Sequence, residues 1–339
     1  MDSNLKPTCS VCIANYNGME VIEACIRSVQ LQDINAQIEI IVHDDASTDN
    51  SAIFIQNKFP DVKLIHSKEN VGFCISNNRM AEVAKGEYLL FLNNDAELYS
   101  DALRTLYNSA RKEPSAILGL PQYNAETGKL IDRGQFFDLF LNPIPNLDPE
   151  IENVGMISGS CIWVSKSVWN ELGGFPDFFS SLAEDLYLCC VARLWGYTVR
   201  VINGSGYRHW VGSSFGGGKV QEKRLSTSIR RRALSERNKT FVMAICYPSP
   251  FFQLVFPVHF CLLLLEGMAL SAIKRDGQLL KKIYLSAYLD LLKNIKKLFI
   301  YRRFHMRKRQ ISITLFLVSF QFVVQKLRMF LVYGIPKVA

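Results

Sequence analysis

The chain has 339 residues, which is too long for one small hydrophobic core and predicts about two domains. Its formal net charge of +8 is distributed unevenly along the chain. Residues 1–220 carry 17 Lys and Arg against 26 Asp and Glu, net −9, whereas residues 221–339 carry 22 against 5, net +17. The basic part predicts an anionic partner, and the long apolar runs between its basic clusters favour a membrane surface over nucleic acid.

Nine cysteines are scattered along the chain, and this odd number is typical of a reducing compartment rather than of a disulfide framework. Cys9 and Cys12 have the spacing of half a zinc site, but no second pair with metal-ligand spacing follows, so zinc is not expected. Residues 1–7 are polar and lack the apolar segment of a signal peptide. We therefore expect the acidic part of the chain in the cytoplasm.

Short apolar runs alternate with segments of helical periodicity in the first third of the chain. The predicted strands cover residues 9–15, 38–42, 62–65 and 88–92. The predicted helices cover residues 21–31, 50–59, 72–86 and 101–112. Strands that alternate with helices of this length are typical of a parallel sheet with helices on both faces.

The regular pattern lapses between residues 121 and 153, which are rich in Pro, Asn, Asp and Gly. They predict an insertion or hairpin over the site, because long loops of this kind tend to be functional. Predicted strands at 116–120, 157–164 and 198–202 and helices at 166–172 and 183–195 complete this part of the chain.

From residue 226 the composition changes to basic clusters and apolar runs. Residues 251–265 are mostly apolar but shorter than the roughly 20 residues of a spanning helix, which favours an interfacial or re-entrant helix; an extension to Ile273 would make a span possible. Residues 311–333 predict another apolar helix that lies on a bilayer, because polar residues interrupt it. Basic residues beside such helices suit anionic headgroups of the cytoplasmic leaflet. A soluble helical subdomain is the alternative.

Three groups of carboxylates lie where predicted strands end or helices begin: Asp44–Asp45, Asp95 and Glu184–Asp185. Ligands of open α/β sheets bind beyond the carboxyl ends of the strands, so the three groups predict one shared crevice. Asp95 follows a buried apolar run and suits a hard cation such as Mg or Mn, which takes oxygen ligands. Asp45 is placed to accept a hydrogen bond from a base or ribose. Helix capping is the alternative role for these residues.

Glu184 and Asp185 begin a predicted helix, whose dipole favours an ionised carboxylate that can take a proton. His209 follows the last predicted strand and either adds a nitrogen ligand or packs among aromatic neighbours. The segment Gly216–Lys219 lacks the first Gly and the final Ser or Thr of a phosphate loop, and it predicts a plain loop. No G-x-G-x-x-G follows the first strand, so a dinucleotide cofactor is not expected.

Six motifs follow one another in a fixed order between residues 8 and 240. They are Val11–Asn17, Asp44–Asp49, Glu69–Phe73 with Asn77–Asn78, Phe91–Asp95, Gly173–Phe175 with Glu184–Asp185, and His209. As an ordered set they resemble the family 2 glycosyltransferases with the GT-A fold, particularly the rhamnosyltransferase-like branch of bacterial surface-polysaccharide synthesis. The resemblance implies an α/β fold with a mostly parallel sheet flanked by helices, which we assign to residues 1–225 as the catalytic domain. Residues 226–339 then form a helical, membrane-associated region.

The resemblance also implies roles for individual residues. Asp45 would hold the nucleotide base, with Ala14 and Tyr16 beside the nucleotide and Asn78 and Asn94 completing the donor site. Asp95, the last residue of a D-x-D-like motif, would bind Mg or Mn together with His209. Asp185, next to Glu184, would be the catalytic base.

The chain departs from the family pattern at two places. Many members have a D-x-D where this chain has Asn93-Asn94-Asp95, which leaves one carboxylate for the metal. After Glu184–Asp185 the family commonly has a second Asp two residues on and then an Arg, where this chain has Leu186–Cys190.

These features together predict an inverting glycosyltransferase. It would move a sugar such as rhamnose from a nucleotide diphosphate sugar to a polyprenyl-diphosphate-linked glycan. It would work on the cytoplasmic leaflet of the bacterial inner membrane, bound peripherally or through a short C-terminal embedded segment. No nucleic-acid partner is expected, and the sequence does not give the oligomeric state.

Two alternatives stay open. A nucleotidyltransferase would share the sheet and the metal, but it should carry a Gly-rich phosphate loop after its first strand, where this chain has Asn15–Gly18. A non-catalytic, membrane-docked nucleotide-sugar-binding protein would have the same division of charge.

Overall fold

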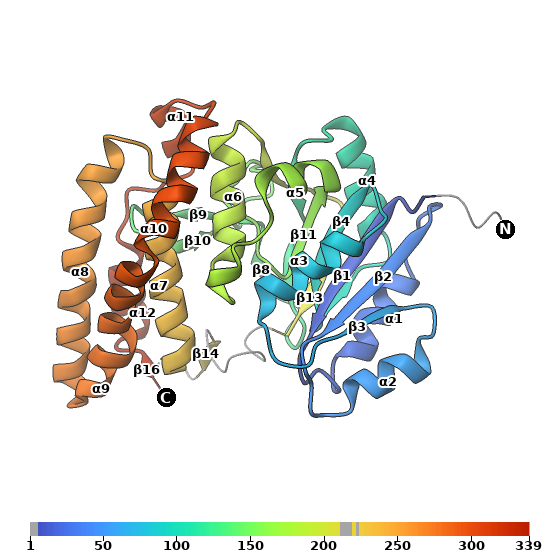
Figure 1. Ribbon diagram of the computed structural model, residues 1–339, viewed down its shortest axis with the longest axis horizontal. Coiled ribbons are helices and arrows are strands. Elements are labelled where there is room, and N and C mark those ends of the chain that lie inside the picture. The colour runs from blue at the N-terminus through green and yellow to red at the C-terminus, as the bar shows by residue number, and fades with distance from the viewer. Residues whose placement is uncertain (1–5, 211–218, 222–223, 339) are drawn as a thin grey trace. The chain divides into compact units, whose positions relative to one another are not determined.

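The computed structural model describes residues 6–210, 219–221 and 224–338 (Figure 1). They form two compact units: unit 1 comprises residues 1–135, 145–189 and 197–210, and unit 2 comprises residues 136–144, 190–196 and 211–339. Parts of two segments considered in the sequence analysis, residues 1–5 and 216–218, lie outside the described residues.

A seven-stranded sheet forms the centre of unit 1, in the order β12-β6-β11-β4-β1-β2-β3. The strands are β1 (Cys9–Asn15), β2 (Ile38–Asp44), β3 (Lys63–His66), β4 (Tyr88–Asn93), β6 (Ile117–Gly119), β11 (Cys161–Ser165) and β12 (Val199–Val201). β1 pairs in parallel with β2 and β4, and β2 with β3, whereas β11 runs antiparallel between β4 and β6. The predicted mostly parallel sheet is thus confirmed. The strand predicted over 157–164 begins only at Cys161, because residues 158–160 form a turn.

Helices flank this sheet, and α3 packs against β1 and β2 (Figure 1). The helices are α1 (Ile22–Gln30), α2 (Ser51–Lys58), α3 (Phe73–Val83), α4 (Ala102–Lys112), α5 (Lys166–Leu172) and α6 (Glu184–Leu194), with a 3₁₀ turn at Asp177–Phe179. α5 has a capped beginning, where Ser165 Oγ accepts from the Val168 amide, and it ends at Gly173 in the left-handed region. The predicted alternation of strands and helices is therefore present in unit 1.

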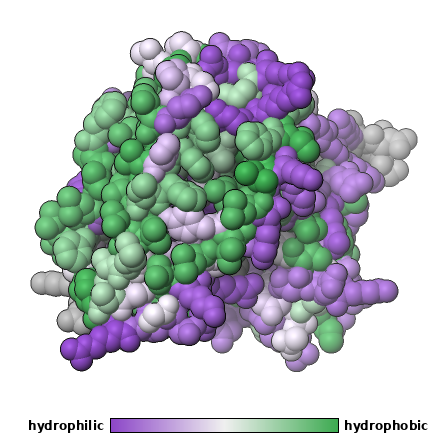
Figure 2. All heavy atoms as spheres, turned by 60° about the vertical axis from the view of Figure 1, so that its left-hand side comes forward, coloured by the Kyte–Doolittle hydropathy of each residue, from purple (hydrophilic) through white to green (hydrophobic). Residues whose placement is uncertain are grey.

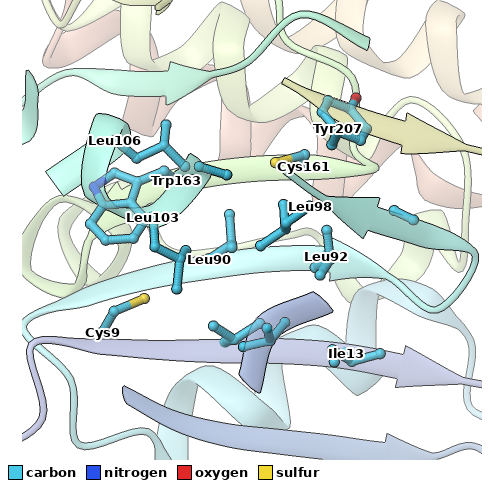
Figure 3. Close-up of a cluster of buried hydrophobic side chains, with 14 of the residues drawn as sticks. Cys9, Ile13, Leu90, Leu92, Leu98, Leu103, Leu106, Cys161, Trp163 and Tyr207 are labelled. Carbon is cyan, nitrogen blue, oxygen red and sulfur yellow. The ribbon is translucent and has the colours of Figure 1, made fainter. Parts of the chain in front are cut away.

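The core of unit 1 explains why its central strands are apolar along their whole length. Both faces of the sheet are covered by helices, so successive residues of one strand are all buried. Figure 3 shows side chains of β1, β4 and β11 gathered with side chains of α4, including Cys9, Ile13, Leu90, Leu92, Leu103, Leu106 and Trp163. This rigid layer holds the ends of β1, β2 and β4 in place.

A second sheet of four short strands, in the order β5-β13-β7-β8, follows the end of β4. The strands are β5 (Ala96–Leu98), β13 (Tyr207–His209), β7 (Gln122–Asn124) and β8 (Leu130–Asp132). β13 pairs antiparallel with β5 and parallel with β7, and β7 and β8 form a hairpin. The first part of the irregular stretch 121–153 is thus a hairpin, one of the two forms predicted for it. Two further short strands, β9 (Gln135–Phe137) and β10 (Pro143–Pro145), follow it.

Unit 2 consists mainly of helices. They are α7 (Ile229–Cys246), α8 (Phe251–Lys274), α9 (Gly277–Leu279), a π-helical turn at Leu280–Leu285, α10 (Ser286–Arg307), α11 (Ile313–Leu317) and α12 (Gln325–Tyr333). Short strands β14 (Lys219–Gln221), β15 (Arg224–Thr227) and β16 (Lys337–Val338) form a small sheet. Among the described residues, α8 alone is long and apolar enough to cross a membrane, and it includes the extension to Ile273.

The prediction of one helix over 311–333 is wrong, because the segment forms the two short helices α11 and α12. The residues between them bond to Phe137 of β9 as well as to one another. The Phe137 amide donates to Ser319 O at 3.0 Å, and the Gln321 amide donates to Phe137 O at 2.7 Å. These bonds take up backbone groups that a continuous helix would need.

The surface of unit 2 is unusually apolar. Figure 2, with α8 and α12 turned toward the viewer, shows apolar side chains gathered over a broad face. Most of the large exposed apolar side chains in the described residues belong to this unit. We call the following residues the apolar face: Leu254, Val258, Leu262, Leu265, Met268 and Ile273 on α8; Leu289, Leu292, Phe299 and Ile300 on α10; and Val318, Phe322, Leu327, Phe330, Leu331 and Val332.

Charged side chains lie inside the same unit. The carboxylate of Glu236 is 3.1 Å from the Lys239 ammonium and 2.8 Å from that of Lys326. Glu266 of α8 bonds Lys326 and Arg232, each at 2.6 Å. Burial opposes charge on Glu236, but the nearby Lys239, Lys326 and Arg232 more than offset it and hold its pKa well below the usual range. We refer to these five residues as the ion cluster.

Candidate active site

The ends of β1, β2 and β4 meet at one edge of the central sheet, as the sequence predicts for the tips of parallel strands. Asn15 pairs with Asp44 across β1 and β2. Its Nδ2 donates to Asp44 Oδ1 at 3.0 Å, and its Oδ1 accepts from Asn94 Nδ2 at 3.0 Å. Gly18 lies against this pair: a Cβ there would be 2.2 Å from Asn15 Oδ1 and 2.4 Å from Asn94 Nδ2. Any larger residue at position 18 would therefore displace the side chain of Asn15 or Asn94.

Asp45 is buried and holds a neighbouring loop. Its two carboxylate oxygens accept from the backbone amides of Val71 and Gly72, at 2.7 and 2.9 Å. Gly72 has φ +89°, and a Cβ there would be 2.9 Å from the carbonyl oxygen and hydroxyl of Ser180. The contact with a nucleotide base stays a prediction. In this structure the carboxylate fixes the loop that would border such a base.

The other predicted donor-site residues differ in how available they are. Tyr16, at the end of β1, is 52% exposed and free to lie against a ligand, whereas Ala14 is half-buried within the strand. The amide of Asn78 is fully used: Nδ2 donates to Phe175 O and to Asp177 Oδ1, both at 2.8 Å, and Oδ1 accepts from the Phe175 amide at 3.1 Å. The observed contacts of Asn78 thus fix the segment 175–177, and its donor role stays a prediction.

The two predicted metal ligands lie together. Asp95 follows β4 and His209 ends β13, and the β5–β13 ladder places Ala96 opposite His209. His209 Nε2 is 3.0 Å from Asp95 Oδ1, and the Trp210 amide donates to Asp95 O at 3.1 Å. Both side chains are buried, with 3% and 9% of their residue surfaces exposed. One carboxylate oxygen and one imidazole nitrogen thus face each other.

The surroundings of this pair suit a small hard cation. Asn93 Nδ2 lies 3.4 Å from His209 Nε2, and Asn93 Oδ1 is buried with no hydrogen-bond partner among the described residues. Within those residues no group of three or more His, Cys, Asp and Glu side chains is arranged to hold a metal ion. Mg²⁺ and Mn²⁺ need no such cage, because they bind through one or two carboxylates plus substrate phosphates and water, and Mn²⁺ also accepts imidazole. Asp95 and His209 therefore fit such an ion, and a half-turn of the Asn93 amide would turn its unpaired oxygen toward His209.

A buried hydrogen-bond chain supports His209 from its other side. Gln122 Nε2 lies 2.9 Å from His209 Nδ1, and Gln122 Oε1 accepts from the Tyr207 hydroxyl at 2.9 Å. The Tyr207 hydroxyl is also 2.7 Å from Ser160 Oγ, which is 2.9 Å from Ser158 Oγ. Tyr207 and His209 share a face of β13 because residues two apart on a strand point the same way.

The predicted base lies at the beginning of α6. Asp185 Oδ2 accepts from the Gly159 amide at 2.8 Å, and Oδ1 accepts from the Leu186 amide at 2.7 Å. The preceding turn is strained, because Ser180, Leu182 and Ala183 have φ between +62° and +70°. A Cβ on Gly159 would be 3.3 Å from Glu184 Oε1 and 3.4 Å from Asp185 Oδ2, so both acids lie beside this glycine.

Residues 158–160 connect the two halves of the site. The Gly159 amide bonds Asp185, while Ser160 O accepts from the Asn93 amide at 3.0 Å and Ser160 Oγ bonds Tyr207. The turn thus bonds Asp185 directly, and it reaches Asp95 and His209 through Asn93 and Tyr207, each two residues earlier in the chain.

Asp132 is a further acid near the site that the sequence did not single out. It lies opposite Gln122 in the β7–β8 hairpin, and it accepts from the Gly134 amide at 3.0 Å and from Gln135 Nε2 at 3.1 Å. Burial raises its pKa to about 6, and the charge of Asp185 adds to that increase. The negative charge of Asp132 is therefore costly near neutral pH.

Several residues of the site cannot be recognised as site residues from a single sequence. Gln122 and Asp132 fall in the stretch 121–153, where no periodicity marks a strand, and Ser160 precedes one. Only Tyr207 had a weak signal, because it stands two residues before His209 in a short strand. The contacts of these residues depend on pairing between strands of three residues, which is fixed by tertiary structure.

Comparison with known proteins gives consistent matches. Residues 10–173 match the family model described as Glycosyl transferase family 2. The uncharacterized glycosyltransferase YibD of Escherichia coli is 36% identical over 120 residues, which cover 34% of this chain and 33% of YibD. The GalNAc(5)-diNAcBac-PP-undecaprenol beta-1,3-glucosyltransferase of Campylobacter jejuni is 33% identical over 117 residues, which cover 33% of this chain and 38% of that protein. The matched segment thus spans little more than a third of these curated relatives.

A solved structure has a similar fold. The crystal structure of GalNAc-T7 with UDP, GalNAc and Mn²⁺ superposes with a TM-score of 0.57 at 17% identity, covering 71% of this chain and 49% of that one. At this identity the likeness concerns the fold, which agrees with the GT-A arrangement expected from the sequence.

Proposed function

Since residues 10–173 of this chain belong to glycosyl transferase family 2, we propose that the protein is an inverting glycosyltransferase that uses a nucleotide diphosphate sugar. The observation that carries the proposal is the turn at residues 158–160, which bonds Asp185 directly and reaches the Asp95–His209 pair through neighbouring residues. A base on one side of this turn and a cation site on the other are what a single displacement at an anomeric carbon requires.

Asp185 is the proposed base. The hydroxyl of the acceptor attacks the anomeric carbon while Asp185 takes its proton, and the nucleoside diphosphate departs. The Gly159 and Leu186 amides, at 2.8 and 2.7 Å, orient the carboxylate. Glu184 is buried beside Gly159 and narrows the space around the Asp185 carboxylate.

Asp95 and His209 are the proposed cation ligands, with Asn93 Oδ1 as a third donor atom. A bound Mg²⁺ or Mn²⁺ would offset the negative charge of the departing diphosphate. The bound Mn²⁺ in the GalNAc-T7 structure supports a cation of this class. Asp45, Ala14, Tyr16 and Asn94 surround the proposed donor, with Asn78 holding the segment behind it.

The proposed acceptor is a polyprenyl-diphosphate-linked glycan. The Campylobacter relative bears the name of an enzyme whose substrate is linked to undecaprenol through a diphosphate, which supports a lipid-linked acceptor here. The rhamnosyltransferase-like resemblance makes an activated 6-deoxyhexose the first donor to try.

We place the protein at the cytoplasmic leaflet of the bacterial inner membrane, where such a lipid presents its glycan. The apolar face of unit 2 would enter the acyl region, and the basic residues of the C-terminal part, net +17 over residues 221–339, would contact anionic headgroups. The catalytic part, residues 1–225, would then work next to the membrane surface.

The test is release of nucleoside diphosphate from a panel of nucleotide sugars, with Mg²⁺ or Mn²⁺ and a lipid-linked glycan fraction. We expect Asp185→Asn to lower turnover by roughly 10³-fold while the dissociation constant of the donor stays within about threefold. Asp61→Asn, a change at an exposed turn, is the matched control and should turn over normally.

Turnover of Asp185→Asn at the wild-type rate would contradict the assignment of the base. Release of pyrophosphate from a nucleoside triphosphate and a sugar phosphate would instead indicate a nucleotidyltransferase. Donor binding with no turnover under any condition would indicate a binding protein.

A further inference from the structure

The hydrogen bonds of Gln122 determine which nitrogen of His209 carries the ring proton. As the side chain lies, its Nε2 faces His209 Nδ1 at 2.9 Å and its Oε1 accepts from Tyr207 at 2.9 Å. Because an amide nitrogen only donates, the short Gln122 contact requires Nδ1 to accept and puts the proton of the neutral ring on Nε2, whereas the longer contact of 3.4 Å from Asn93 Nδ2 suits the opposite tautomer. That proton points to Asp95 Oδ1 at 3.0 Å. In this state Nε2 has no lone pair for a metal ion.

A half-turn of the Gln122 amide keeps its bonds to His209 and Tyr207 with their directions reversed, and it gives up the bond from His209 Nε2–H to Asp95. Gln122 Oε1 would then accept from the Nδ1–H of His209, and its Nε2 would donate to the Tyr207 oxygen. The Tyr207 proton would move to the bond with Ser160 Oγ, now 2.7 Å long, and Ser160 would donate to Ser158 Oγ at 2.9 Å. Two hydroxyl groups that each donate or accept satisfy the amide in both orientations, so the two states differ in the bond between His209 and Asp95, whose place a cation would take.

The reversed state frees Nε2 of His209. Its lone pair would lie beside Asp95 Oδ1 and near Asn93, whose Oδ1 has no hydrogen-bond partner among the described residues. Metal-bound histidines usually donate their other N–H to an oxygen, which fixes the tautomer. Gln122, Tyr207 and Ser160 are buried, so bulk water does not replace the bonds among them.

We propose that Gln122 is a positioning residue that switches His209 between a cation-free tautomer and a cation-binding tautomer, with Tyr207 and Ser160 holding the amide in either orientation. The inference rests on the proposed function, because it takes Asp95 and His209 as the cation ligands. It goes further in assigning a role to a residue that touches neither the cation nor the sugar.

Two substitutions at this position should act differently. Gln122→Glu gives a side chain whose ionised form only accepts, which favours the Nδ1–H tautomer that binds the cation. Gln122→Met keeps the size but offers no acceptor. We expect the dissociation constant for Mn²⁺, measured by the electron paramagnetic resonance of free Mn²⁺, to rise 10- to 100-fold in Gln122→Met and to stay within threefold or fall in Gln122→Glu.

The matched control is Gln32→Met. Gln32 also has a fully used amide, which bonds Ser28 O, Tyr99 O and the Leu103 amide, but none of these partners belongs to the site. Its loss should lower thermal stability and leave the Mn²⁺ dissociation constant unchanged. Equal weakening of Mn²⁺ binding in both Gln122 variants, or no change in either, would overturn the proposal and make Gln122 a packing residue.

A measurement on the unaltered full-length protein avoids the question of whether a variant folds. Nitrogen-15 NMR separates the two tautomers of histidine, and the signal of His209 is the one missing from His209→Asn. We expect the Nε2–H tautomer without cation and the Nδ1–H tautomer with saturating Mg²⁺. The same tautomer in both conditions would overturn the proposal. Absence of any Mg²⁺ or Mn²⁺ binding to the wild type would instead contradict the cation site of the proposed function.

Discussion

The two units of this protein distribute polar and apolar side chains in opposite ways. Unit 1 buries continuous apolar strands and gathers its acids at strand ends, where they bond backbone amides and one another. Unit 2 buries Glu236 and Lys239 of its ion cluster and leaves large apolar side chains exposed on α8, α10, α11 and α12. Each arrangement is unfavourable in the surroundings that suit the other.

The difference indicates two surroundings for one chain. A water-soluble body gains free energy by hiding apolar side chains, which is what unit 1 does. An exposed apolar face would lower the free energy where it enters an acyl region, which is the surrounding proposed for unit 2. The division of charge along the sequence, net −9 and net +17, follows the same boundary closely. Four experiments test this contrast between the units.

The largest effect is expected in the ion cluster. Glu236→Gln leaves the buried ammonium group of Lys239 without its counter-charge, while Lys326 keeps Glu266, and the change should lower the free energy of unfolding of unit 2 by about 3–5 kcal/mol. Hydrogen exchange of peptides from α7, followed with increasing urea, measures it. The matched change in unit 1 is Asp33→Asn, which removes an exposed pair with Arg104 and should cost less than about 0.5 kcal/mol. Similar losses of unfolding free energy in Glu236→Gln and Asp33→Asn would contradict the contrast between the two units.

The next effect concerns the apolar face. Leu331→Ser with Val332→Ser should lower the partition onto vesicles with anionic lipid by about 100-fold, because each side chain contributes about 1.5 kcal/mol of transfer free energy. These residues are 75% and 61% exposed, and Leu31 and Ile53 of unit 1 match them at 73% and 60%. Leu31→Ser with Ile53→Ser should leave the partition unchanged. Flotation in a density gradient measures the partition of both double variants. An equal partition of the two would contradict the proposed contact between the apolar face and a membrane.

A smaller effect comes from Asp132. Its folded pKa of about 6 lies above the ordinary value of 3.8 because of burial, so its charge destabilises unit 1 above pH 6, and this cost is absent below about pH 4. Asp132→Asn should therefore raise the free energy of unfolding by about 2 kcal/mol at pH 7.5, and the gain should fade as the pH is lowered toward 4. Chemical denaturation at several pH values checks this. A gain independent of pH would mean that Asp132 is uncharged throughout.

The smallest effect is expected from a methyl group. Gly18→Ala places a Cβ within 2.4 Å of the amide atoms of Asn15 and Asn94, and the shift that relieves this contact should lower stability by about 1–2 kcal/mol and weaken donor binding. Gly277→Ala in unit 2 meets open space and should be neutral. Thermal melting and donor titration measure both, and a neutral Gly18→Ala would show that the turn after β1 can move freely.

The sequence predicted those parts of the fold whose cause is local. Residues 88–92 were predicted as a buried strand because an unbroken apolar run ends at polar residues, and β4 covers Tyr88–Asn93. The break within 311–333 was not predictable, since the composition there is evenly apolar and the break depends on backbone bonds to Phe137. β5, β7 and β13 have three residues each, too few to show a period of two.

The same distinction holds for the site. Asp95 and His209 were predicted from motifs, and the structure brings them within 3.0 Å. No local sequence pattern identifies Gln122. Its importance comes from its bond to Tyr207 of β13, which lies beside it in space but 85 residues away in the chain. Asn78 shows the converse: a motif residue whose observed partners, Phe175 and Asp177, are those of a structural brace.

The turn at residues 158–160 has a consequence for how proteins of this kind diverge. Because its backbone bonds Asp185 on one side and Asn93 on the other, inserting or deleting one residue there would change the spacing between the two halves of the site. Natural length variation should therefore be absent at these three positions and frequent in connections that touch neither half. A survey of lengths among relatives would then outline the reaction centre without reference to any side chain.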